Sequence, residues 1–119
     1  MRKFLTKYLS PFLAVTLFLV LSSGCARRAH LSANIENYQY SPSTGNVEVH
    51  ILVKNDGERN IGTYRVQYGV TYNSFPHNSW ISGLNLNAGE SRTEYGITSI
   101  GTGKTVSDVA VTDIKWEAQ

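Results

Sequence analysis

The three histidines are the side chains of this 119-residue protein best suited to hold a metal, but their spacing does not form a site. His30, His50 and His77 are far apart in the sequence, and no His-x-His or His-Glu-x-x-His stretch occurs. Closely spaced ligands of that kind are the usual signature of a zinc or catalytic metal centre. The sequence therefore predicts no bound metal.

The hydroxyl and carboxyl residues stand in settings that do not favour catalysis. Seven serines or threonines occur between Ser91 and Ser107, and none lies in a Gly-x-Ser-x-Gly stretch. Gly101–Lys104 reads GTGK, lacks the spacing of a phosphate-binding loop, and is interpreted as a hairpin turn. Asp108 and Asp113, five positions apart in a predicted strand, are expected to face opposite sides, so they form no acid–base pair. We therefore expect no enzyme activity and no cofactor.

Cys25 is the single cysteine, and it stands directly behind an apolar run. Three basic residues lie within the first seven positions, Phe12–Leu21 is apolar, and three small residues follow. This is the layout of a secretory signal peptide. A retained membrane helix is the alternative, but the 17 residues of Tyr8–Gly24 include a proline and three serines. That stretch falls short of the ~20 apolar residues that a span needs.

Ser23, Gly24 and Cys25 resemble the lipobox of bacterial lipoproteins. Ser22 departs from the pattern, because leucine is preferred there and Leu21 lies one position too early. The resemblance implies that signal peptidase II removes residues 1–24 and that Cys25 carries diacylglycerol and a further acyl chain such as palmitate. The alternative is an ordinary signal peptide followed by an incidental free cysteine, although an unpaired exported thiol invites oxidation.

The residue after the cysteine bears on location. Ala26 stands where an aspartate would retain a lipoprotein in the inner membrane, so for a Gram-negative cell the resemblance implies the periplasmic face of the outer membrane. Residues 25–33 are then expected to be the lipidated cysteine and a short tether, and residues 34–119 the folded domain. Arg27 and Arg28 either lie among anionic head groups or only keep this tether soluble.

The net positive charge belongs to the predicted signal peptide. The chain has 11 basic and 9 acidic residues, and removing the three basic residues of the signal leaves 8 against 9, a net charge of −1. The sequence therefore predicts no nucleic-acid binding. With one cysteine, the domain cannot form an internal disulfide.

Apolar residues alternate with polar ones from about position 35 onward, a period of two that is typical of strands. Val47, Val49, Ile51 and Val53 predict one buried face. The stripe of Tyr64, Val66, Tyr68, Val70 and Tyr72 repeats the pattern. Its tyrosines are expected to pack in the sheet, and a partly exposed binding surface is the alternative. Other expected strands are Ile35–Tyr40, Trp80–Leu86, Arg92–Ser99 and Val106–Trp116.

The last predicted strand changes phase between Val111 and Ile114. A β-bulge near Thr112 would keep one inward face, and the alternative is a strand covered partly on both faces. Turn-forming residues separate all these segments at short intervals. The whole pattern predicts an all-β protein: a single antiparallel immunoglobulin-like β-sandwich of six or seven short strands.

Asn55, Gly57, Gly89 and Glu90 carry a second resemblance, which covers residues 46–99. A strand ending in Asn-x-Gly, a tyrosine-rich strand and an Ala-Gly-Glu turn are similar to the small bacterial sandwich modules of the CARDB and FxLyD type. That resemblance implies an adhesive, scaffolding or accessory role without catalytic residues.

These observations together predict an outer-membrane-anchored periplasmic lipoprotein that acts as a non-catalytic module binding an envelope protein. A pilotin-like or assembly chaperone is the first alternative, and a small-ligand carrier is the second. The stretch Asn73–Trp80 is predicted to be a long loop holding the partner site, with Phe75, Pro76 and Trp80 as contacts. Alternatively, Trp80 begins the next strand and packs inward, leaving only Phe75 exposed.

Overall fold

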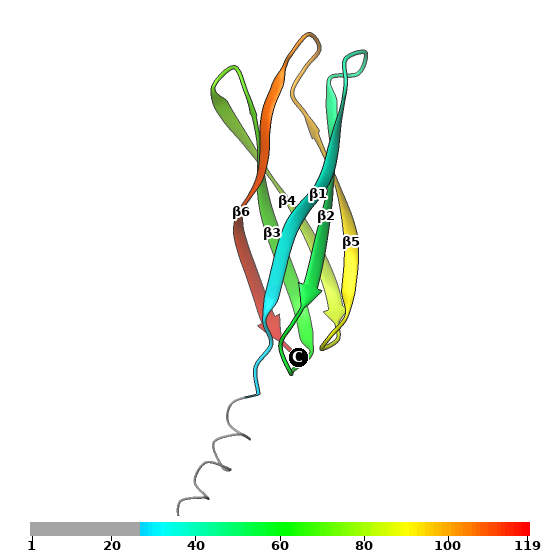
Figure 1. Ribbon diagram of the computed structural model, residues 1–119, viewed down its shortest axis with the longest axis vertical. Helices are drawn as coiled ribbons and strands as arrows, with labels where there is room; N and C mark the ends of the chain where they lie inside the picture. The colour runs from blue at the N-terminus through cyan, green and yellow to red at the C-terminus, as the bar shows by residue number, and fades with distance from the viewer. Residues whose placement is uncertain (1–26) are drawn as a thin grey trace, which may run out of the picture.

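All regular structure in the part of the chain that the structure describes is β-strand. The computed structural model describes residues 27–119, so the predicted signal peptide and Cys25 lie outside the described residues. The strands are β1 (Leu31–Ser41), β2 (Asn46–Asn55), β3 (Ile61–Tyr72), β4 (Phe75–Leu86), β5 (Ser91–Ser99) and β6 (Val106–Ala118) (Figure 1). The all-β prediction is confirmed.

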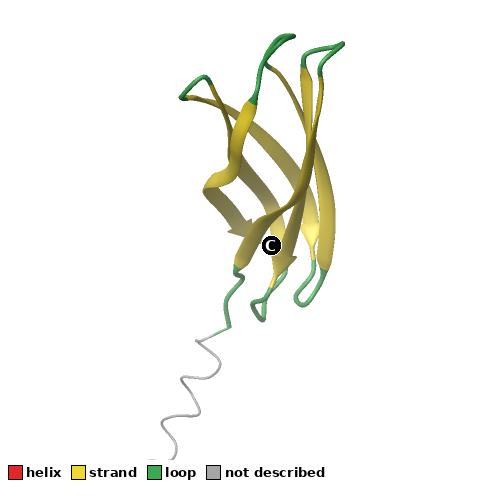
Figure 2. Cartoon of the chain, turned by 45° about the horizontal axis from the view of Figure 1, so that its top comes forward, coloured by secondary structure: helices red, strands yellow, loops and turns green. Residues whose placement is uncertain are grey.

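The strands form two three-stranded antiparallel sheets, in the orders β1-β2-β5 and β4-β3-β6. Figure 2 shows them as two layers. Pairing joins strands that are distant in sequence, β2 with β5 and β3 with β6, because the chain changes sheet after β2, β4 and β5. This Greek-key pairing is typical of immunoglobulin-like sandwiches. Six strands agree with the predicted six or seven.

The two ends of the sandwich hold different connections. The β1–β2 turn, the β3–β4 turn and the β5–β6 loop lie at one end, which we call the distal end (Figure 1). The β2–β3 loop, the β4–β5 turn, residues 27–30 and the end of β6 lie at the other, which we call the base. The chain therefore enters and leaves the domain at the base.

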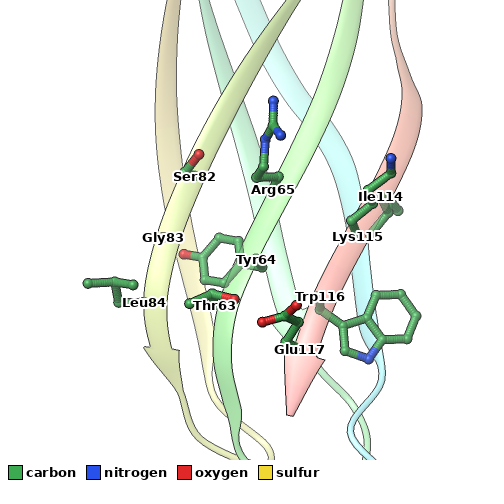
Figure 3. Close-up of a pocket in the computed structure, with 10 residues that line it drawn as sticks. All are labelled: Thr63, Tyr64, Arg65, Ser82, Gly83, Leu84, Ile114, Lys115, Trp116 and Glu117. Atoms are coloured by element: carbon green, nitrogen blue, oxygen red, sulfur yellow. The ribbon is translucent and has the colours of Figure 1, made fainter. Parts of the chain in front are cut away.

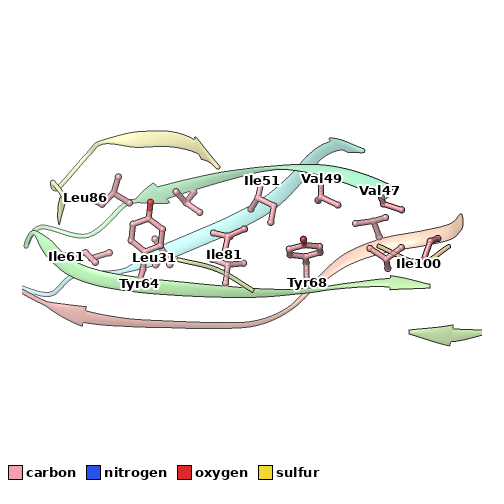
Figure 4. Packing of buried hydrophobic residues seen from close by; sticks show 14 residues of the cluster. Leu31, Val47, Val49, Ile51, Ile61, Tyr64, Tyr68, Ile81, Leu86 and Ile100 are labelled. Atoms are coloured by element: carbon pink, nitrogen blue, oxygen red, sulfur yellow. The ribbon is translucent and has the colours of Figure 1, made fainter. Parts of the chain in front are cut away.

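The core lies between the sheets and is built from the alternating residues of β2 and β3 (Figure 4). Val47, Val49, Ile51 and Val53 are fully buried, as predicted. Each side chain of this size stabilises the fold by about 1.5–3 kcal/mol when removed from water. Residues from every strand or its flanking loop complete the cluster, among them Leu31, Ile61, Val66, Val70, Ile81, Leu86, Ile100 and Val109.

Two buried tyrosines of β3 fill the space between the sheets, which confirms their packing role. Tyr64 and Tyr68 are fully buried, and the hydroxyl of Tyr68 lies 2.8 Å from Thr98 Oγ1 on β5. A Cβ atom added at Gly83 would overlap the Tyr64 hydroxyl, and one added at Gly96 would overlap that of Tyr68. Glycine is therefore required at these two positions, because the tyrosine hydroxyls lie close to the backbone there.

Of the two alternatives for the phase change in β6, the bulge near Thr112 is present. Gln67 pairs with Asp113 and the next residue of β3 pairs with Val111, which leaves Thr112 as the extra residue. The bulge returns Ile114 to the inward side that Val111 occupies, and both pack against the core.

The bulge also overturns one prediction. Asp108 and Asp113 do not face opposite sides: they pair with Thr71 and Gln67, which share the outward face of β3. Strict alternation would place them on different faces of the sheet. Thr112 is an extra residue between them, so both lie on the outward face. Their partners are four residues apart on β3, about 13 Å at 3.3 Å per residue, so the carboxylates are not adjacent.

The hairpin interpretation of Gly101–Lys104 is wrong as well. This stretch belongs to the loop that joins β5 in one sheet to β6 in the other. Gly101 and Gly103 do adopt left-handed conformations, with φ of 97° and 69°. Glycines in such conformations serve hairpins and inter-sheet loops alike, so the local pattern did not separate the two.

Strand β1 begins at Leu31, earlier than the expected start at Ile35, so it includes part of the stretch expected as tether. Leu31 is buried in the core. A bulge at Glu36 interrupts the alternation of β1, between the pairs made by Ile35 and Asn37. That interruption hides the continuity of the strand from a period-two pattern.

Candidate binding surfaces

The stretch Asn73–Trp80 is a strand end rather than a loop. Only Asn73 and Ser74 form the turn, with φ of 51° and 67°, and Tyr72 pairs directly with Phe75. Two positive φ values are the signature of a tight two-residue hairpin, in which asparagine is favoured. Pro76 is accommodated because β4 is an edge strand. The prediction of a long loop is therefore wrong.

Phe75 lies at the distal end of β4 and is 71% exposed. Its partner Tyr72 lies near two groups from the distal end: the His77 ring at 6.4 Å between centres, and Lys104 Nζ at 5.6 Å from the Tyr72 ring centre. Pro76 pairs with Thr71 one step along the strand, so it faces the other side of the sheet.

Trp80 lies on the outward face of β4, opposite Gln67 of β3. Its side chain is 38% exposed, and the guanidinium carbon of Arg65 lies 4.0 Å from the centre of its ring. Trp80 is therefore neither in a loop nor in the core. The expected loop and the inward-packing alternative are both wrong, and the role of Trp80 as a partner contact stays a prediction. Phe75 and Trp80 also lie on opposite sides of β4 and do not form one surface.

A groove runs over the outward face of the sheet β4-β3-β6, and its β4 residues follow Trp80 in the strand. Figure 3 shows the residues that line it. Its volume is about 730 Å³, and all three strands of the sheet line it. Leu84 on β4 is 61% exposed at this groove, and Arg65 belongs both to its lining and to the contact with Trp80. We call Trp80, Arg65, Leu84 and the groove the groove face.

Lys115 and Glu117 of β6 line the opposite side of the groove. Lys115 Nζ lies 3.8 Å from Asp113 Oδ2, and both side chains are largely exposed. An exposed ion pair of this kind contributes little to the free energy of unfolding. The groove face thus has Trp80 and Leu84 on β4 and a charged rim on β6, the composition of a protein-binding surface.

A polar cluster beneath the groove joins the sheets at the edge formed by β4 and β5. The Tyr64 hydroxyl donates to the carboxylate of Glu94 and accepts from Arg92 Nη1 at 3.2 Å. Arg92 also donates to the Leu84 and Asn85 carbonyl oxygens, at 2.8 and 3.0 Å. Burial, and then the hydrogen bond to Glu94, raises the pKa of Tyr64 to about 12. Tyr64 therefore stays protonated near neutral pH and acts as a donor that holds the edge, not as a base.

The base holds a second polar cluster, centred on the buried side chain of Asn55. Asn55 Oδ1 accepts from the backbone N–H groups of His30 (3.3 Å) and Gly57 (3.0 Å). Asn55 Nδ2 donates to the carbonyl oxygens of Arg59 (2.8 Å) and Leu86 (3.1 Å). One side chain thus satisfies backbone groups from residues 27–30, the β2–β3 loop and the end of β4.

Gly89 and Glu90 complete this cluster through the backbone. Gly89 N donates to the Asn55 carbonyl oxygen at 2.8 Å, and Asn55 N donates to that of Glu90 at 3.0 Å. The four residues of the Asn-x-Gly and Gly-Glu patterns therefore lie together. Sequence reasoning identified each as a turn former but did not foresee their contact; the Asn-x-Gly spacing after a buried strand was the available signal.

The described histidines are spread over the surface. His30 contacts the Asp56 carboxylate, and this hydrogen bond lowers the pKa of Asp56. His50 Nε2 lies 3.0 Å from Glu48 Oε2. Across residues 27–119, no three His, Cys, Asp or Glu side chains gather as metal ligands, and no helix is long and apolar enough to cross a bilayer.

Comparisons of the chain with family models, with curated proteins and with solved structures found no match. The resemblances to lipoproteins and to CARDB or FxLyD modules therefore remain predictions from the sequence.

Proposed function

We propose that this protein is a lipid-anchored β-sandwich that binds an envelope protein through its groove face and performs no catalysis. The observation that carries the proposal is the exposed Trp80–Arg65 pair beside Leu84 and the groove. Tryptophan and arginine are the residue types most enriched among interface side chains that dominate affinity. Their mutual contact orders both before a partner arrives, which lowers the entropy cost of binding.

The strand scaffold supports this role. Trp80, Leu84 and Arg65 stand on paired strands rather than in loops, so the core beneath holds their spacing. An exposed apolar surface beside a rim of charge is what a protein partner covers on binding. The outward face of the other sheet is the runner-up surface, since Tyr95 and Ile97 of β5 are 62% and 68% exposed there.

The anchor part of the proposal rests on Cys25 and the preceding residues. Intact mass of the membrane-extracted protein should show loss of residues 1–24 and the addition of acyl chains. Cys25→Ser should abolish the acyl mass and release the protein from the membrane fraction. A Cys25→Ser protein that is still cut after Gly24 and remains in the membrane would contradict the anchor.

The binding part is tested by recovering partners from detergent-solubilised envelopes. Trp80→Ala and Leu84→Ala should each weaken partner recovery, by about 30-fold in affinity if the residue is an anchor of about 2 kcal/mol. Tyr95→Ala, on the runner-up surface of the opposite sheet, is the comparison variant and should recover the partner in full. Loss of the partner in this variant instead would favour the runner-up surface. Full recovery with both groove-face variants would exclude this face, and a co-purifying small molecule in place of a protein would favour a carrier.

A further inference from the structure

The folded body of the domain reaches back to Arg28, close to the predicted anchor. The Arg28 carbonyl oxygen accepts hydrogen bonds from the backbone N–H groups of Glu58 (2.7 Å) and Arg59 (3.2 Å). The His30 carbonyl oxygen accepts from Asp56 N at 2.9 Å. Gly57 makes this docking possible, because a Cβ atom there would overlap the Arg28 carbonyl oxygen. From Arg28 onward, backbone hydrogen bonds hold the chain against the domain.

Very little chain is left between this body and Cys25. Ala26 and Arg27 alone separate Cys25 from Arg28. Three residue steps of 3.3–3.6 Å reach about 10–11 Å when fully extended. The polar head-group region of one leaflet is itself about 5–8 Å thick. A lipidated Cys25 would therefore hold the base at the head groups, an inference that rests on the lipid anchor of the proposed function.

The base carries a hollow suited to a phosphate group. Arg27, Glu58, Arg59, Asn60 and Gln119 line it. Arg59 Nη2 donates to the Gln119 carbonyl oxygen at 3.0 Å, which fixes one guanidinium group at the hollow. Planar guanidinium groups bind phosphate oxygens with two parallel hydrogen bonds. The guanidinium groups of Arg27 and Arg59 thus offer this hollow two phosphate-binding groups, beside the carboxylate of Glu58.

We propose that the base docks on the bilayer with a phospholipid phosphate in the hollow between Arg27 and Arg59, so that the sandwich stands upright. Strand β3 has 12 residues and spans about 40 Å at 3.3–3.4 Å per residue. The distal turns therefore lie some 40 Å from the head groups. The groove face stands perpendicular to the membrane, where a periplasmic partner can reach it.

The test places a fluorescent label at each end of the acylated full-length protein. Cys25 is the single cysteine and its sulfur is consumed by the lipid, so an introduced cysteine is the one free thiol. Ala88→Cys labels the exposed β4–β5 turn at the base, and Thr102→Cys labels the exposed β5–β6 loop at the distal end. In phosphatidylglycerol vesicles with head-group quenchers, we expect at least fivefold stronger quenching at position 88. Equal quenching at the two positions would overturn the upright docking.

The phosphate contact is tested with the arginines. Arg27→Gln with Arg59→Gln should at least halve the quenching at position 88, and so should vesicles of an uncharged glycolipid without phosphate. Arg65→Gln, an arginine on the groove face, is the matched control and should leave the quenching unchanged. Unchanged quenching in the double variant would overturn the role of the hollow.

Intact mass separates failure of this inference from failure of the anchor. A protein without acyl mass would overturn the proposed anchor and the docking that depends on it. A protein with acyl mass and equal quenching at both ends would overturn the docking alone.

Discussion

The base and the distal end of the sandwich are closed in different ways. At the base, the buried Asn55 side chain makes four hydrogen bonds to backbone groups of separate segments. At the distal end, the β1–β2 turn and the β5–β6 loop meet through backbone bonds such as Ile100 N to the Gly45 carbonyl oxygen at 2.8 Å. The Tyr40 hydroxyl of β1 adds two bonds to the β5–β6 loop, to the Gly101 carbonyl oxygen and from Lys104 N. The β3–β4 turn stands apart from both in Figures 1 and 2.

The two ends therefore have different roles: the base fixes the N-terminal residues of the domain, and the distal hairpin exposes a side chain to solvent. The base sets where the N-terminal residues leave the fold, because Asn55 and Gly57 hold residues 28–30 against the β2–β3 loop. The distal β3–β4 hairpin depends mainly on turn geometry and strand pairing, and it leaves Phe75 exposed. Substitutions at the base are therefore expected to cost stability, and those at the hairpin tip are not.

Among the polar contacts, the largest effect is expected from Asn55→Ala. The variant leaves two backbone N–H groups and two carbonyl oxygens at the base without their partner, and each unpaired buried group costs about 1–3 kcal/mol. Allowing for entry of water, we expect a loss of about 3 kcal/mol and a melting temperature lower by roughly 10–20 °C. Asn37→Ala, at an exposed position of β1, is the control and should stay within about 0.5 kcal/mol. Equal melting of the two variants would show that Asn55 does not organise the base.

A smaller effect is expected from alkali, through Tyr64 at the β4–β5 edge. The pKa of Tyr64 is raised from 10.0 to about 12 in the folded protein. Its protonated hydroxyl therefore contributes stability that is complete below pH 10 and is lost as the pH rises toward 12. Melting temperatures measured between pH 9 and pH 12 should fall, and Tyr64→Phe should reduce the steepness of that fall.

Tyr95→Phe is the control for this titration, because Tyr95 is 62% exposed on the outward face of β5. It should leave the alkaline fall in melting temperature unchanged. If Tyr64→Phe and Tyr95→Phe give the same profile as the unaltered protein, another group is responsible for the loss at high pH.

Local patterns in the sequence predicted some elements of the structure and missed others. Local alternation was sufficient for the buried face of β2, and a break in phase indicated the bulge at Thr112 as one of two alternatives. It failed for Asn73–Trp80, because proline and asparagine mark edge strands and tight turns as readily as long loops. It also assigned Asp108 and Asp113 to opposite faces by ignoring that bulge.

Contacts between distant segments had no counterpart in the local pattern. Asn55 and Leu86 are 31 residues apart, yet the Asn55 side chain bonds to the Leu86 carbonyl oxygen. Gly83 and Gly96 are required by tyrosines on another strand, and nothing beside them in the sequence indicates that. The groove face likewise depends on the pairing of β4, β3 and β6, so its residues could be recognised as aromatic, charged or apolar but not as neighbours.

The smallest effect on stability is expected at the hairpin tip. Phe75 is 71% exposed, so Phe75→Ala removes few contacts and should change the free energy of unfolding by no more than about 0.5 kcal/mol. Leu86→Ala, at a fully buried position near the base, should cost about 2–5 kcal/mol by leaving a cavity. Denaturant midpoints of the two variants measure this contrast directly.

Because Phe75→Ala is expected to leave the fold intact, loss of partner recovery in this variant would place Phe75 in the binding site, as the sequence predicts. Full recovery, together with loss in Trp80→Ala, would restrict the site to the groove face. A midpoint for Phe75→Ala as low as that of Leu86→Ala would instead show that the distal hairpin is packed, which contradicts the contrast between the two ends.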